Sequence, residues 1–188
     1  MNKAILMSIR PQHLVNILNG KKTIELRKRF PKDFRGWVYC YCTKGKDILC
    51  RYYDGHWFTT KDRNNNWKRY LNGKVVCRFW VDNVDTIIRS GMGYHVEGQD
   101  IAYTNRLANR SGLMFDDLQE RFGDNNFKAI LISKLEIFDK PKELSEFYYY
   151  KKRLIDCGRD CPPYVDEVKT QVRKAPQSWQ YVYVEDEV

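Results

Sequence analysis

Apolar and polar positions near the start of the chain change from the spacing of a strand to the spacing of a helix. Residues 3–9 form a mostly apolar run, which predicts a buried strand. Pro11 follows, and Leu14 and Leu18 recur at helical spacing, so we expect a short helix with one apolar face. Gly20 would end this helix, because glycine adopts the left-handed conformation at low cost. The pattern therefore predicts a strand and then a helix.

The rest of the chain has the pattern of short strands with a few helices between them. Further strands are predicted at residues 36–42, 74–81, 127–138 and 179–184. Helical patterns at 100–108 and 115–122 fall in an insertion of about 91–125. The charged stretch of about 145–175 predicts a loop or lid. We therefore expect one domain over residues 1–188, of the α+β class, built around a mixed sheet or a small barrel.

The basic segment that follows Gly20 has an alternating pattern of its own, which predicts a strand over residues 23–29. Ile24 and Leu26 should face a core. The alternate positions should face outward or into a cleft, and they are Thr23, Glu25, Arg27 and Arg29. Residues on the same face of a strand lie roughly 6.5–7 Å apart, so this polar set would span about 20 Å. That reach suits a nucleotide together with its neighbouring phosphates.

The charge of the chain supports a polyanionic ligand for this segment. There are 33 Lys and Arg against 24 Asp and Glu, a net charge of +9. Between Gly20 and Arg35 there are seven cations and two acids, so more than half of the excess lies in one short stretch. Basic proteins favour nucleic acid or anionic membranes as partners. As an acid among cations, Glu25 suits a carboxylate that accepts a hydrogen bond from an amino group on a base, or one that takes part in a chemical step. The alternative is that this face of the strand is solvated and Glu25 only neutralises its neighbours.

Several classes of function are not expected. No apolar run is long enough to span a bilayer, and the first residues lack the apolar centre of a signal peptide, so we expect a cytoplasmic protein without a membrane partner. The six cysteines should then be reduced thiols. Cys157 and Cys161 have the spacing of half a zinc site, but no second pair completes the four ligands. We therefore expect no metal and no cofactor.

The order of these motifs resembles the ASCH domain. A strand that ends in Ser8 and a short helix precede a match to the family's G-x-K-x-x-E-x-R signature, which is formed by Gly20, Lys22, Glu25 and Arg27. Residues 175–182 are similar to the closing strand of stand-alone bacterial and phage members. The resemblance covers nearly the whole chain.

The resemblance implies a PUA-like β-barrel, mixed and mostly antiparallel, with flanking short helices. It also implies a cleft, lined by the signature strand, that is proposed to bind RNA. Some small members hydrolyse the acetyl amide of N4-acetylcytidine, and others are linked to RNA cleavage. In the amidohydrolases a Lys and a Thr of the signature strand are catalytic, together with a distant Glu. Lys22 matches that Lys, whereas Glu25 occupies the position of the Thr.

These observations define a candidate site and a leading function. Lys22 and Glu25 are the candidate catalytic residues, with Glu25 activating water and Lys22 stabilising an oxyanion. The predicted ligand contacts are Ser8, Lys21, Lys22, Thr23, Glu25, Arg27, Arg29, Ser178 and Trp179, the last by stacking on a base. The leading function is binding of RNA or a modified nucleoside. The alternatives are a hydrolase that acts on such a ligand, as an amidohydrolase or a ribonuclease, and a module whose basic face binds a protein.

Overall fold

A computed structural model describes residues 2–52, 54–62, 71–91, 93–112, 115–155 and 164–185. In chain order, its elements are β1 (Asn2–Ile9), α1 (Pro11–Leu18), β2 (Ile24–Arg27), β3 (Gly36–Cys42), β4 (Ile48–Arg51), β5 (Trp57–Thr60), β6 (Val75–Ser90), β7 (Gly93–Val96), α2 (Ile101–Ser111), α3 (Phe115–Phe122), β8 (Phe127–Lys142), a 3₁₀ helix η1 (Leu144–Glu146), β9 (Phe147–Ile155), β10 (Tyr164–Gln171) and β11 (Trp179–Val184). The first strand, the first helix and both later helices agree with the pattern of the sequence.

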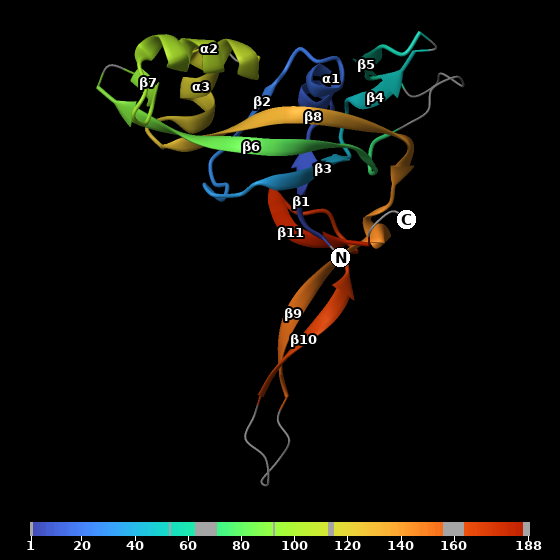
Figure 1. The fold of residues 1–188 in the computed structure, drawn as a ribbon. Helices are drawn as coiled ribbons and strands as arrows, with labels where there is room; N and C mark the ends of the chain where they lie inside the picture. Colours follow the sequence, from blue (N-terminus) through green and yellow to red (C-terminus); the bar gives the residue numbers. More distant parts are fainter. Residues whose placement is uncertain are drawn as a thin grey trace.

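The strands form one large sheet and a separate hairpin (Figure 1). The order in the large sheet is β10-β9-β11-β1-β3-β6-β8-β2, with β7 paired to β6, and the hairpin is β4 with β5. β1 and β3 run parallel, and the other pairings among the described strands are antiparallel. The α+β class and a mixed, mostly antiparallel sheet are therefore confirmed. β10 and β2 are the two edges of this order, and within the described ranges they do not pair with each other.

The two longest strands, β6 and β8, pair with each other, and β8 holds the signature strand β2 at the edge of the sheet. β6 and β8 each span 16 residues and pair with each other through several register shifts. At one shift Lys134 has a φ of 37°, and an extra residue of this kind lets a long strand bend. β8 also pairs with β2, where Glu25 lies opposite Ile130. β2 is thus an edge strand, and its other side can contact loops and helices.

The helices complete two apolar cores that flank the sheet near β2. α1 contributes Leu14 and Ile17 to a core that also contains Met7 of β1. α2 and α3 cover a second core that contains Ile24 and Leu26, so the predicted inward pair is confirmed. Figure 1 shows all three helices at the end of the molecule away from the β9–β10 strands. In the ranges that the structure describes, every helix is too short or too polar to cross a membrane.

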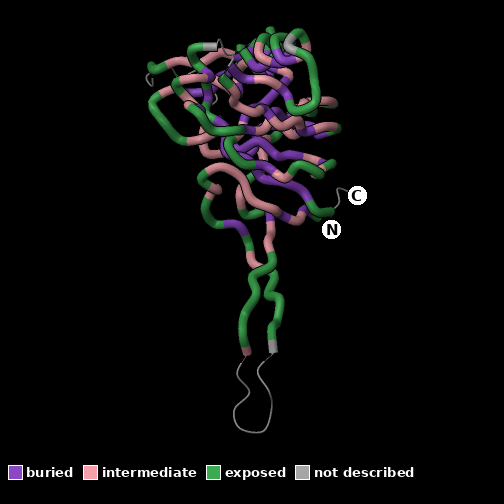
Figure 2. The backbone as a smooth tube through the Cα atoms, turned by 90° about the vertical axis from the view of Figure 1, so that its left-hand side faces the viewer, coloured by how far each residue is buried: buried purple, intermediate pink, exposed green. Residues whose placement is uncertain are grey.

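Strands β9 and β10 form an arm that projects from the body (Figures 1 and 2). They pair antiparallel, with Arg153 opposite Asp166. Phe147 at the base of the arm is fully buried, whereas most residues further out are exposed (Figure 2). Opposite charges across the two strands stabilise this polar pair. Within the range of about 145–175, where a loop or lid was expected, Phe147–Ile155 and Tyr164–Gln171 are thus strands.

Candidate functional site

The loop after α1 brings the signature segment to the edge of the sheet. Gly20 has a φ of +70°, a left-handed conformation that favours glycine at the end of a helix. The backbone N–H of Lys22 then donates to the carbonyl of Asn16 at 2.9 Å. The backbone N–H of Thr23 donates to the carbonyl of Arg110 at 3.0 Å. These contacts fix the entrance of β2 between α1 and the end of α2.

Three charged residues of the signature form a buried chain of ion pairs. The side chains of Lys22 and Glu25 are both only 2% exposed, and Lys22 Nζ lies 3.2 Å from Glu25 Oε2. On the other side, Arg27 Nε lies 3.0 Å from Glu25 Oε1. Lys22 Nζ also donates to the carbonyl of Ser111, at the end of α2, at 3.0 Å. Burying three charges is expensive unless they are paired, and here each oxygen of the carboxylate faces one cation.

Arg27 connects this chain to two other parts of the molecule. Its terminal nitrogen Nη2 donates to the carbonyl of Ser8, in β1, at 2.7 Å, and Nη1 lies 3.4 Å from the hydroxyl of Ser178. Ser8 is itself tied to the segment before β11, because its hydroxyl donates to the carbonyl of Pro176 at 2.6 Å. The structure therefore brings together three predicted residues, Ser8, Arg27 and Ser178, from three separate segments.

The charges in this chain alter one another's pKa values. Burial by itself raises the pKa of Glu25, but Lys22, Arg27 and Arg121 outweigh burial and hold the pKa of that carboxyl below its ordinary value. Burial also lowers the pKa of Lys22, and Glu25 offsets this only in part. Glu25 is therefore a firmly ionised carboxylate at neutral pH.

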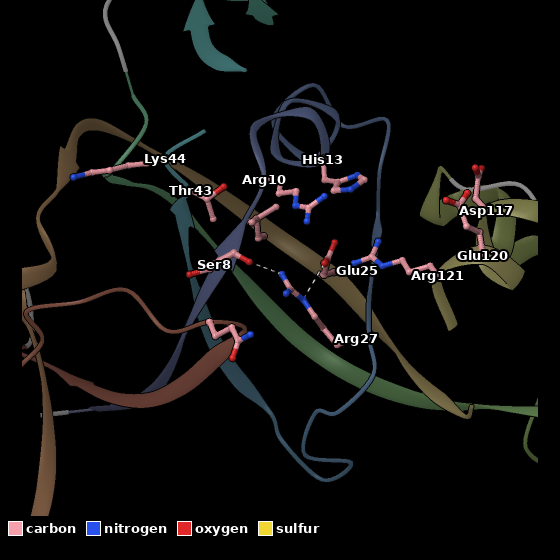
Figure 3. A pocket seen from close by; sticks show the side chains of 12 residues that line it. Ser8, Arg10, His13, Glu25, Arg27, Thr43, Lys44, Asp117, Glu120 and Arg121 are labelled. Carbon is pink, nitrogen blue, oxygen red and sulfur yellow. Dashed lines mark hydrogen bonds and ion pairs between the residues drawn. The ribbon is translucent and has the colours of Figure 1, made fainter. Parts of the chain in front are cut away.

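Glu25 and Arg27 face a cavity of about 680 Å³ beside β2 (Figure 3). Its walls come from β1, α1, β2, the loop after β3, α3 and the segment before β11, and the lining residues are Ser8, Ile9, Arg10, His13, Glu25, Arg27, Thr43, Lys44, Asp117, Glu120, Arg121 and Gln177. Lys22 does not line this cavity, although it contacts Glu25 from behind. Lys22 is thus in a position to orient Glu25 rather than to touch a ligand.

A second cavity, of about 660 Å³, adjoins the first and shares Arg27, Arg121 and Gln177 with it. Its remaining lining residues are Lys28, Arg29, Phe122, Ser178 and Trp179. Every charged residue that lines it is a cation. The two cavities together therefore offer a mixed-charge pocket next to a purely basic groove.

The other predicted contacts have different positions. Thr23 turns toward α2, where its hydroxyl accepts from Nε of Arg110 at 3.0 Å. Lys21 is exposed and lines neither of these two cavities. Trp179 lines the second cavity, but its Nε1 donates to the carbonyl of Arg29 at 2.6 Å and its ring packs edge-on against Phe30. The indole is thus partly used in holding the segment after β2.

Nine of the twelve residues that line the first cavity were absent from the predicted site, and three of them, Arg10, His13 and Arg121, alter its charge. Arg10 is two positions after the predicted Ser8, so the sequence could have indicated that it lies near the site. His13 lies on α1, and burial, Lys22 and two nearby arginines lower its pKa. Arg121 lies on α3, far along the chain, and no local pattern of the sequence links it to β2.

Metal ligation has no support among the residues that the structure describes, since no group of three or more His, Cys, Asp or Glu side chains is arranged to hold an ion there. Cys157 and Cys161 lie outside the described residues. The described cysteines are all buried thiols, and they are Cys40, Cys42, Cys50 and Cys77.

Among known proteins, the matches to this chain come from solved structures. No family model matches the chain, and no curated protein matches its sequence. A crystal structure of ASCH from Zymomonas mobilis has a TM-score of 0.49 and 15% identity, and covers 75% of this chain and 73% of its own. Two point mutants of that protein, ZmASCH, have TM-scores of 0.45 and 0.43 and identities of 17% and 18%. They cover 76% and 75% of this chain and 77% and 74% of their own.

Proposed function

We propose that this protein binds RNA or a modified nucleoside, with a base held in the first cavity against Glu25 and Arg27. The observation that carries the proposal is the carboxylate of Glu25, held by Lys22 and Arg27 at the wall of a cavity of about 680 Å³. Cavities of roughly 300–1,000 Å³ are of the size that holds small ligands. The basic groove beside it suits the phosphates of a chain that continues from the bound base.

The chemistry of the two residues supports recognition of a base edge. An ionised carboxylate only accepts hydrogen bonds and has about four acceptor positions, so Glu25 keeps capacity after its contacts with Lys22 and Arg27. Amino groups on bases are donors that such a carboxylate can select. Arg27 offers further donors beside it, and its contact with Ser8 restricts the orientation of the guanidinium. Donor and acceptor thus lie side by side, as recognition of a base requires.

The hydrolase alternative has weaker support from the same geometry. A general base is most effective when its pKa lies near the working pH, whereas the pKa of Glu25 is held below its ordinary value. Lys22 lies behind Glu25 and does not line the cavity, so it has no direct path to a developing oxyanion. Both features favour a site that binds its ligand rather than one that catalyses a reaction on it.

Titration of ribonucleosides and a short single-stranded RNA tests the proposal. Binding is measured by calorimetry and by fluorescence anisotropy for the protein and for Thr43→Trp, which fills the cavity from a half-buried position outside the ion-pair chain. Lys21→Gln is the matched control, because it removes an exposed cation that lines neither cavity. We expect Thr43→Trp to lose at least about tenfold in affinity, Lys21→Gln to change it little, and RNA affinity to fall with added salt.

Three results would count against the proposal. Absence of binding to every nucleoside and to RNA would leave the protein-partner alternative. Equal affinities for the protein and Thr43→Trp would remove the cavity as the site. Conversion of the nucleoside during the titration, detected by chromatography, would restore the hydrolase alternative.

A further inference from the structure

Two arginines of the first cavity have no counter-ion among the residues that the structure describes. Arg10 lies just after β1 and Arg121 on α3, and within the described residues neither guanidinium forms an ion pair or a hydrogen bond. Arg121 is half-buried and contacts the ring of Phe122. It points from α3 toward Glu25 (Figure 3). A half-buried guanidinium that faces a cavity and has no acceptor is a ready donor set for an anion.

The charge around Glu25 is out of balance. Three cations, Lys22, Arg27 and Arg121, act on one carboxylate, whose two oxygens face Lys22 and Arg27. The exposed Arg10 adds further positive charge beside Arg121. Burial lowers the pKa of Arg121, Glu25 raises it, and Arg27 and Arg10 lower it further. The guanidinium is therefore held where its own positive charge is unfavourable. An anion between the arginines would relieve that cost.

Two acids also line this cavity. Asp117 and Glu120 lie on α3, and both are exposed. Surface carboxylates of this kind are hydrated and screened, so they compensate a half-buried cation poorly. The inner part of the cavity, where Arg121 points, therefore stays positive.

We propose that Arg10 and Arg121 form a subsite for a phosphate group within the first cavity. The inference rests on the proposed function and narrows it, because the preferred ligand becomes a nucleotide or an RNA phosphate next to the bound base, and not a bare nucleoside. Each guanidinium presents a planar fork of donors that matches two phosphate oxygens. The arginines enter from different elements, so a phosphate between them links α3 to the end of β1.

His13 provides a readout of phosphate binding that does not depend on affinity. Its side chain lies in the same cavity, and Lys22, Arg121 and Arg10 are among the groups that lower its pKa, while Glu25 raises it. A phosphate dianion in the subsite would raise the pKa of His13 again. Proton NMR follows this titration, and His13→Asn identifies its signal among the three histidines of the chain.

The experiment compares a ribonucleoside, its 5′-monophosphate, inorganic phosphate and a short RNA. Affinities are measured for the protein, Arg10→Gln and Arg121→Gln. Arg106→Gln is the matched control, because it removes an exposed arginine of α2 that lines neither cavity. We expect the monophosphate to bind at least about tenfold more tightly than the nucleoside. This ratio should fall toward one in Arg10→Gln and Arg121→Gln and should be kept in Arg106→Gln. Circular dichroism checks that each variant is folded.

The possible results separate this inference from the proposed function. Nucleoside binding with no gain from a phosphate, in the monophosphate or in the RNA, would overturn the subsite alone. A rise in the pKa of His13 with inorganic phosphate, absent in Arg121→Gln, would support the subsite even if no nucleoside or RNA bound. Loss of the phosphate gain in Arg106→Gln as well would reduce the effect to net charge and overturn the inference. If Arg10→Gln and Arg121→Gln weakened RNA binding but left binding of the monophosphate unchanged, the subsite would be one for an internal phosphodiester of RNA.

Discussion

Arg27 Nε lies 3.0 Å from Glu25 Oε1, and the two residues are separated by one position along β2. Alternate residues of a strand share a face, so the strand itself brings this guanidinium and this carboxylate together. Lys22 completes the arrangement from the loop before β2, at 3.2 Å from the second oxygen. Six consecutive positions thus supply two buried charges, Lys22 and Glu25, and a third on Arg27, which is 12% exposed. The three stabilise one another and orient one carboxylate toward the cavity.

Removing the carboxylate should destabilise the protein strongly. Glu25→Leu would leave Lys22 and Arg27 buried without their anion, and breaking a buried pair in this way costs about 3–5 kcal/mol. The free energy of unfolding from urea denaturation checks this. A decrease in the free energy of unfolding of less than about 1 kcal/mol would show that water reaches the two cations in the variant.

A second substitution should recover part of that loss. In Lys22→Met/Glu25→Leu the buried ammonium is gone along with the carboxylate, and apolar side chains replace the pair. We expect the double variant to be more stable than Glu25→Leu alone, with a coupling free energy above about 1 kcal/mol in a double-mutant cycle. Additive effects of the two substitutions would contradict direct pairing of Lys22 with Glu25.

The sequence could predict which face of β2 each residue occupies, but not what covers that face. Ile24 and Leu26 reach the core as their alternation requires. The opposite face was expected to be open or to line a cleft. Glu25 does line the first cavity, but its side chain is buried among neighbours from distant parts of the chain. Burial of an edge strand depends on such tertiary neighbours, and alternation carries no information about them.

The same limit explains the two larger omissions. Arg121 joins the cavity because α3 packs beside β2, and only the three-dimensional arrangement of those elements could reveal it. The β9–β10 arm lacks an apolar face, so a search for alternating hydrophobicity finds no strand there. Its order comes from cross-strand partners such as Arg153 and Asp166, which lie at unrelated positions of the sequence.

Stability should fall on mild acidification in a way that depends on His13. The pKa of His13 is lowered in the folded protein by burial and by Lys22, Arg121 and Arg10, against Glu25. The unfolded chain therefore binds a proton on this residue at a higher pH than the folded protein does. Below the ordinary value of 6.5 the unfolded state gains the proton first, so the free energy of unfolding decreases as pH falls.

The His13→Asn variant isolates this effect. Urea denaturation at about pH 7.5 and about pH 5.5 should show a smaller loss of stability in His13→Asn than in the parent protein. His56 and His95 are present in both proteins, so their contributions cancel in the comparison. Equal losses in the two proteins would mean that His13 titrates in the folded state as it does in the unfolded chain.

The described cysteines should not react in the native protein. Cys40 and Cys77 lie opposite each other on β3 and β6, and burial raises the pKa of Cys40 well above its ordinary value. Burial also raises the pKa of Cys42 to about 12. Because the thiolate is the reactive form, these thiols should be inert at neutral pH.

A thiol assay checks this in a variant with Cys157→Ser and Cys161→Ser, which retains four of the six cysteines. A chromogenic disulfide should label none of the four before unfolding and all of them in concentrated guanidinium chloride. Rapid labelling of even one thiol in the native variant would mean that the sheet opens locally between β3 and β6 or at β4.

The arm should be dispensable for the stability of the body. Its anchor is Phe147, which is fully buried and whose carbonyl accepts from the N–H of the buried Val172 at 2.8 Å. Further out, Tyr149 lies opposite Thr170, so an Asn-Gly turn can join these two residues in place of 150–169. The shortened chain loses the exposed Lys169–Glu185 pair, and pairs of this kind contribute at most about 1 kcal/mol. It also loses the edge-on contact of Tyr150 with Tyr183 of β11, and such a ring pair contributes about 1 kcal/mol.

We therefore expect the free energy of unfolding of the shortened protein to stay within about 2 kcal/mol of the full chain. Phe147→Ala is the informative comparison, since removing a buried phenylalanine costs about 3–5 kcal/mol. Urea denaturation of the two variants side by side separates the base of the arm from its length. If the shortened protein lost as much stability as Phe147→Ala, the outer strands would contribute more to the stability of the body than these exposed contacts can supply. The arm would then fold and unfold as one unit with the core sheet.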